Sequence, residues 1–252
     1  MHKHDPAWAR QSVIDTIVSR PFLRNLTLTF PGMVSWPMDV LYLNQEFFAK
    51  LSPKMPLDFS HVAVARMGFY LDHSLLPHLR ALRSLELIDI APVNGIPLRP
   101  LVEIYKTLAR ERIFLSHIVI DDVFPEFLDY LSSYSGILVE LSILYLHKPT
   151  PWVELDVLAE QFYGSVLLKH VKSLELLNIS PIFRCKWCFD PQDCSVLSQA
   201  KQLHSLSVSF PASLPSTHSW STLPNPYDYE FGLDEAVCDC FLLFETSTEK
   251  CH

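Results

Sequence analysis

The fold is indicated most clearly by residues 82–90, which read LRSLELIDI. Apolar residues occupy the first, fourth, sixth and ninth positions of this stretch. On a short strand the fourth and sixth side chains point to the same face, while the first and ninth fit into the turns on either side. One such unit cannot bury its apolar face alone, so the pattern predicts a chain in which several units stack.

The same spacing recurs along the chain. Its first positions are residues 23, 59, 82, 115, 138, 171 and 203, at intervals of 23 to 36 residues by subtraction. These intervals fall in or just above the range of leucine-rich repeats. The apolar positions of the units, in chain order, are Leu23-Leu26-Leu28, Phe59-Val62-Val64-Met67, Leu82-Leu85-Leu87-Ile90, Leu115-Ile118-Ile120-Val123, Leu138-Leu141-Ile143-Leu146, Val171-Leu174-Leu176-Ile179 and Leu203-Leu206-Val208.

Segments with helical apolar spacing lie between these expected strands, for example over residues 98–108 and 155–167. Helical crossovers between parallel strands favour an α/β fold. We expect an irregular, right-handed leucine-rich-repeat solenoid, with a parallel sheet on its concave side and helices on its convex side. Residues 1–22 are expected to form an N-terminal capping helix, residues 23–210 a solenoid of about seven units, and residues 211–252 a Ser/Pro-rich, poorly ordered tail in which 241–244 could add a strand.

Composition excludes several classes of function. The chain has 20 Lys and Arg against 28 Asp and Glu, a net charge of −8, which disfavours nucleic-acid binding. The longest apolar stretch, residues 136–146, is too short to span a bilayer, and the N-terminus does not resemble a signal peptide. We therefore expect a protein of the cytoplasm or nucleus with reduced cysteines and without a membrane partner.

The cysteines are the most specific candidates for chemistry. Cys185 and Cys188 form a C-x-x-C pair, Cys194 is nearby, and Cys238 and Cys240 lie in the tail. These five residues could hold a structural zinc ion or act in redox chemistry, although their spacing fits none of the usual paired patterns. We favour the interpretation in which Trp187 and Cys188 pack in a loop against the stack.

Motifs of catalysis are absent from the sequence. It contains no G-x-S-x-G, H-E-x-x-H or G-x-x-x-x-G-K. Asp121 and Asp122 end a strand and could bind a metal, but a capping turn explains them better. We expect no catalytic activity and no cofactor.

The repeat also predicts a surface, because the third, fifth and seventh positions of each unit point away from the core. No Lys or Arg occurs at these positions, and the face is acidic and partly apolar. Such a face suits a protein partner with a basic or amphipathic segment. The candidate partner-binding residues are Glu86, Ile88, Asp121, Glu140, Leu144, Glu175 and Leu177.

Several passages support a resemblance to a known family. Residues 158–163 (LAEQFY), 170–175 (HVKSLE), 186–189 (KWCF) and 203–209 (LHSLSVS) resemble the leucine-rich-repeat region of fungal F-box-like proteins. The likeness covers roughly residues 20–210, with loose motifs. It implies repeats that hold a substrate for a ubiquitin ligase, recruited through a Skp1-type adaptor that binds an F-box. No Leu/Pro-rich F-box helices precede Leu23, which separates this chain from the family's usual plan.

Overall fold

The computed structural model describes residues 12, 15–17, 19–20, 22–29, 56–66, 69, 71, 75–90, 99–144, 152–181, 185–189, 194–209 and 241–245. At residues 99–100, 152–153, 194 and 241–245 only the backbone is described. Within the expected N-terminal helix, residues 12 and 15–17 are helical and Ile17 is buried. The rest of residues 1–22, and most of 211–252, lie outside the described residues.

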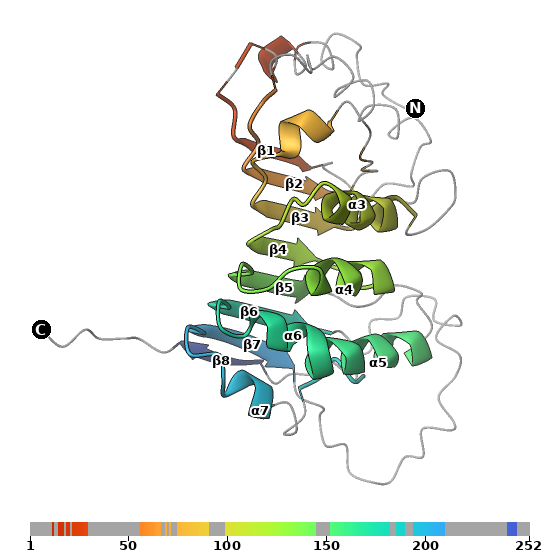
Figure 1. Cartoon of the computed structure of the whole chain (residues 1–252), viewed down its shortest axis with the longest axis vertical. Coiled ribbons are helices and arrows are strands. Elements are labelled where there is room, and N and C mark those ends of the chain that lie inside the picture. The colour runs from red at the N-terminus through yellow and green to blue at the C-terminus, as the bar shows by residue number, and fades with distance from the viewer. Residues whose placement is uncertain are drawn as a thin grey trace, which may run out of the picture.

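One sheet organises the described chain (Figure 1). Seven parallel strands follow one another in sequence order, and an antiparallel eighth strand lies beside the seventh. The expected α/β class with a parallel sheet is therefore confirmed. The strands are β1 (Asn25–Thr29), β2 (His61–Ala65), β3 (Ser84–Ile88), β4 (His117–Ile120), β5 (Glu140–Leu144), β6 (Leu176–Ser180), β7 (Ser205–Ser209) and β8 (Phe241–Glu245).

Helices lie alongside the sheet, with α3, α4 and α5 stacked in the same order as the strands they connect (Figure 1). Proline is the first or second residue of η1, α3 and α4, where its missing N–H costs nothing. The helical elements are η1 (Leu76–Leu79), α3 (Arg99–Arg110), α4 (Pro125–Ser132), α5 (Trp152–Gln161), η2 (Phe162–Val166), α6 (Leu167–His170) and α7 (Cys194–Leu197).

The core lies between the sheet and these helices. In β3 the side chains of Leu85 and Leu87 are buried, while the residues on either side of them are partly exposed. The helices contribute large apolar side chains to the same core, including Tyr105, Phe127 and Phe162, which are all at most 1% exposed. Burial of this continuous apolar layer stabilises the packing of the helices on the sheet.

A regular backbone joint links successive units. The carbonyl of the residue just before each of the strands β1 to β6 accepts two N–H groups from the next unit. For example, the carbonyl of Arg83 accepts the N–H groups of Ser116 and His117 at 2.8 and 3.0 Å. The residues that supply these carbonyls are Arg24, Ser60, Arg83, Ser116, Val139 and Glu175.

The segment η2 is a π-helix, which widens the helical turn by one residue. This change buries Phe162 and Tyr163, which are adjacent in sequence, on the same side. Both rings contact Trp187, with ring centroids 5.3 and 6.2 Å away. Trp187 is fully buried and Cys188 is 4% exposed, so the prediction that they pack in a loop against the stack is confirmed.

Candidate interaction surface

The sheet face opposite the buried strand residues is defined by the strand register. Residues at equivalent positions of neighbouring strands align, so three rows of side chains cross the sheet. We call this the open face. Its first row is Asn25, His61, Ser84, His117, Glu140, Leu176 and Ser205, its second is Thr27, Ala63, Glu86, Val119, Ser142, Asn178 and Ser207, and its third includes Thr29, Ala65, Ile88, Leu144, Ser180 and Ser209.

Four of the predicted partner-binding residues lie on the open face and are partly exposed. They are Glu86 and Ile88 on β3, and Glu140 and Leu144 on β5. The strand β4 separates these two pairs, so roughly 10 Å lies between them across the sheet. Two carboxylates and two aliphatic side chains thus occupy one area of the surface.

Polar contacts organise the Glu86 end of this area. The imidazole Nδ1 of His61 is 2.8 Å from the hydroxyl oxygen of Ser84, and its Nε2 is 3.9 Å from the carboxylate of Glu86. The Glu86 side chain is 40% exposed. A contact this long and this exposed contributes little to stability, so the carboxylate of Glu86 stays available to a ligand.

Leu177 was predicted to be on the surface. This prediction is wrong, since Leu177 is fully buried. The repeat in the sixth unit begins at Leu174 rather than Val171, and Leu177 and Ile179 are the two side chains of β6 in the core. The register shows this directly, since Leu176 pairs with Glu140 and Leu177 with Leu141. Both Val171 and Leu174 are apolar, so spacing alone favoured the wrong frame.

The same shift moves Glu175 out of the strand. Glu175 lies just before β6, at the backbone joint, where its carbonyl accepts the N–H groups of His204 and Ser205. Its carboxylate is 3.6 Å from Nε2 of His204, and both side chains are about half exposed. Glu175 therefore lies at the edge of the open face rather than within it.

Asp121 was also predicted to be on the surface. This prediction is wrong too, since only 2% of Asp121 is exposed. Its carboxylate accepts the backbone N–H of Asp89 at 2.6 Å. Asp89 has a positive φ of 51°, a conformation that needs such local support in a residue other than glycine. Asp121 therefore stabilises the turn after β3 and is not a partner-binding residue.

Two basic side chains that were not predicted from the sequence border the open face. Arg24 and Arg83 are exposed and occupy the joint position just before β1 and β3. The second position of each repeat is the signal that would have identified them. Of the strands β3, β4 and β5, only β3 has a basic residue at this position, since Ser116 and Val139 precede the other two.

The cysteines are only partly described. Cys185 and Cys188 are thiols at the ends of one turn, while the side chain of Cys194 and all of Cys238 and Cys240 lie outside the described residues. The hydrogen bond with Cys188 and then burial raise the pKa of the Cys185 thiol above its ordinary value. Among the described side chains, no group of three or more His, Cys, Asp or Glu residues is placed to hold a metal ion.

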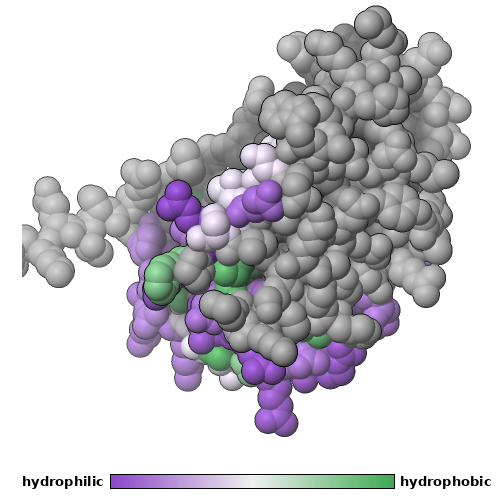
Figure 2. Space-filling model, turned by 90° about the horizontal axis from the view of Figure 1, so that it is seen from above, coloured by the Kyte–Doolittle hydropathy of each residue, from purple (hydrophilic) through white to green (hydrophobic). Residues whose placement is uncertain are grey.

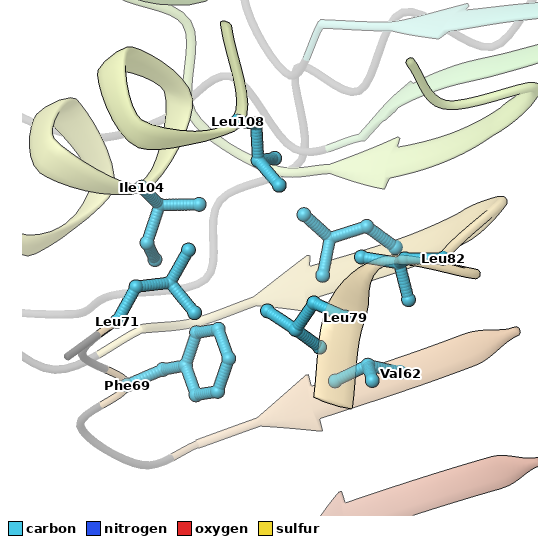
Figure 3. Close-up of a pocket in the computed structure, with 8 residues that line it drawn as sticks. Val62, Phe69, Leu71, Leu79, Leu82, Ile104 and Leu108 are labelled. Atoms are coloured by element: carbon cyan, nitrogen blue, oxygen red, sulfur yellow. The ribbon is translucent and has the colours of Figure 1, made fainter. Parts of the chain in front are cut away.

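One apolar gap lies between β2, β3 and α3 (Figure 3). Phe69, Leu79 and Ile104 point into it, and every side chain that lines it is apolar. The gap does not admit a sphere the size of a water molecule, so it is a packing defect of the core rather than a ligand site.

Two buried histidines are held as structural groups. Nδ1 of His78 accepts the backbone N–H of Leu57 at 2.8 Å, and Nε2 of His170 lies 2.9 Å from the carbonyl of Leu131. Burial lowers the pKa of both rings, so both are neutral at pH 7. They belong to the core and not to the open face.

Seen from the β1 end, the coloured surface is mostly hydrophilic, with small separate apolar areas (Figure 2). None of the described helices is both long enough and apolar enough to cross a lipid bilayer. Comparison of the chain with protein-family models, with curated proteins and with solved structures found no match.

Proposed function

We propose that the protein is a non-catalytic interaction module built as an irregular, right-handed leucine-rich-repeat solenoid. The sheet would line its concave side and the helices its convex side. The sequential order of the parallel strands and the six equivalent backbone joints support this architecture. Through the resemblance to F-box-like proteins, we further propose that it holds a substrate for a ubiquitin ligase.

The observation that carries the proposal is the area formed by Glu86 and Ile88 on β3 and by Glu140 and Leu144 on β5, with β4 between them. Lys and Arg are absent from the described positions of the open face, although the chain has 20 of them. Carboxylates beside partly exposed aliphatic side chains are complementary to a segment that has both basic and apolar residues.

The spacing of the two carboxylates defines the segment more closely. Two strand spacings across the sheet and two residues along it separate Glu86 from Glu140 by roughly 12 Å. In an extended segment, residues four positions apart lie about 13 Å apart and point to the same side, so this distance fits two basic residues at that spacing. An apolar residue between or beside them would contact Ile88 or Leu144. Recognition would rest on complementary shape and charge, without a chemical step.

Charge reversal on the open face tests the proposal. The double variant Glu86→Lys and Glu140→Lys should lose its partner in affinity purification from fungal cell extract, with binding at least tenfold weaker, because like charges then face each other. The matched control is Glu103→Lys with Asp129→Lys, which changes the net charge equally at exposed positions of α3 and α4.

A partner kept by the wild type and the control, but lost by the open-face variant, supports the proposed surface. A partner lost by both variants, or kept by both, would show that the open face is not the binding surface. Recovery of a Skp1-type adaptor with the wild-type chain would support the ligase link. If a partner protein is recovered without a Skp1-type adaptor, the chain is a stand-alone binding module.

A further inference from the structure

The turn formed by residues 185–189 brings two thiols together. The backbone N–H of Cys188 donates to the carbonyl of Cys185 at 2.9 Å, which closes a four-residue turn. The Cα atoms at the ends of such a turn lie within about 7 Å, and a disulfide bridges Cα atoms about 4.4–6.8 Å apart. The two thiols are hydrogen-bonded to each other, and neither is in a disulfide.

Contacts on both sides hold this turn in place. The indole N–H of Trp187 donates to the carbonyl of Leu155 at 3.0 Å. The backbone N–H of Lys186 donates to a carboxylate oxygen of Asp156 at 2.9 Å, and that of Phe189 donates to the carbonyl of Ser209 at 2.8 Å. The turn is therefore anchored to α5 and to β7, and its ends are already placed for a bond between the two sulfur atoms.

We propose that Cys185 and Cys188 form a thiol–disulfide modification site that reacts with small disulfides of the glutathione type. Cys185 is partly exposed and Cys188 is buried, so Cys185 is the sulfur that an outside disulfide meets first. Cys188 is then the resolving thiol. This property is independent of the open face.

The exchange proceeds in two steps. The Cys185 thiol loses its proton, and its sulfur attacks one sulfur of oxidised glutathione, which breaks the S–S bond and releases one glutathione thiolate. The Cys188 sulfur, after losing its own proton, attacks the Cys185 sulfur of this mixed disulfide and releases the second glutathione. The cysteine pair loses two electrons, glutathione disulfide gains them, and the two thiol protons pass to the two released thiolates.

The reaction should be slow at neutral pH and faster in alkaline solution. The thiolate is the attacking species, and the hydrogen bond with Cys188 and burial raise the pKa of the Cys185 thiol. As long as the pH is below that pKa, an increase of one pH unit raises the thiolate fraction about tenfold. The rate should therefore rise by about tenfold between pH 7 and pH 8.

The test uses the full chain incubated with oxidised glutathione, then trapped with N-ethylmaleimide under denaturing conditions. Trypsin cuts after Arg184 and chymotrypsin after Phe189, so the segment 185–189 is separated from Cys194. Trypsin also cuts after Lys186 and chymotrypsin after Trp187, so the two cysteines can end on separate peptides. We expect both cysteines to be recovered without N-ethylmaleimide and joined by an S–S bond, which reduction before digestion abolishes.

Two variants provide controls, with far-UV circular dichroism to show that each is folded. Cys194→Ser should keep the oxidised segment, and Cys188→Ser should leave Cys185 reduced or joined to glutathione. A wild-type product in which Cys185 is joined to Cys194, or in which both Cys185 and Cys188 are alkylated after oxidation, would overturn the proposal.

Discussion

Two buried tyrosines show how differently one hydroxyl group contributes in the same core. The hydroxyl of Tyr130 accepts the N–H of Leu115 and donates to the carbonyl of Ile113, both at 2.9 Å. The hydroxyl of Tyr105 is buried and has no hydrogen-bond partner among the described residues. Burial raises the pKa of both phenols, so both hydroxyls stay protonated at neutral pH.

Removal of these hydroxyls should have unequal effects. We expect Tyr130→Phe to lower the free energy of unfolding by about 1–3 kcal/mol, because it leaves two buried backbone groups unpaired. Tyr105→Phe, the matched control, should change it by less than about 0.5 kcal/mol or raise it slightly. Urea unfolding of both variants measures the difference, and equal losses would contradict the assignment.

His170 should make stability depend on pH. Burial, opposed by the hydrogen bond to Leu131 and reinforced by the charge of Lys169, lowers the pKa of His170 in the folded chain. The unfolded chain therefore takes up a proton at a higher pH than the folded chain does. The free energy of unfolding should be unaffected above the ordinary histidine pKa of about 6.5 and should fall as the pH drops below it, by up to about 1.4 kcal/mol for each unit of pKa shift.

The variant His170→Gln isolates this effect, since Gln keeps an N–H donor for the carbonyl of Leu131 and does not titrate. Unfolding measured at pH 7.5 and pH 5.5 should show a smaller loss of stability for the variant than for the wild type. Part of the slope should persist, because burial also lowers the pKa of His78. An unchanged slope would show that His170 does not titrate differently on unfolding.

At the scale of the elements, the faces of the strands are the assignment most open to test. Leu177 is fully buried on β6, whereas Leu144 at the end of β5 is partly exposed. We expect Leu177→Ala to lower the free energy of unfolding by about 2–5 kcal/mol, as for other core leucines. Leu144→Ala should cost less than about 1 kcal/mol. Urea unfolding measures both losses. A larger loss for Leu144→Ala than for Leu177→Ala would show that the frame predicted from the sequence is the correct one.

Apolar spacing predicted the strands well and their frame less well. In β3 the predicted inward residues, Leu85 and Leu87, are the buried ones. In the sixth unit Leu174, Leu176 and Leu177 are all apolar, so the spacing fits two frames that differ by three residues. Only the pairing with β5 distinguishes them, and pairing depends on residues far away in the sequence.

Position in the repeat misled the prediction in one further way. Asp121 was expected at the surface because it occupies the seventh position of its unit, which should point away from the core. Its partner is the backbone N–H of Asp89, 32 residues earlier, and no local pattern indicates that contact. Likewise, the π-helix that turns both Phe162 and Tyr163 toward Trp187 has no signature in helical spacing.

For the molecule as a whole, the sequential sheet predicts stability that varies along the stack. The side chains of Asn25, Thr27 and Thr29 are exposed, and β1 pairs with β2 alone among the described strands. Central strands β4 and β5 are covered on both sides by neighbours. At the other end, β8 covers the edge of β7.

Hydrogen exchange measures this gradient. We expect the amides of β4 and β5, such as those of Ile118 and Leu141, to exchange at least about tenfold more slowly than that of Leu28 in β1, because the end of a stack opens without breaking its centre. Peptide-resolved exchange at neutral pH gives these rates. Uniform rates across the sheet would show that the stack opens only as one cooperative unit.

The backbone joints also bear on how such a chain grows in evolution. Each joint is made by a carbonyl and two N–H groups of the main chain, so the bonds are the same whether the residue is Arg83 or Val139. A duplicated gene segment that encodes one strand and its crossover would therefore meet compatible bonds at both new boundaries. Duplication or deletion of such segments can lengthen or shorten the protein by whole units. The area of the open face can therefore change without a new fold.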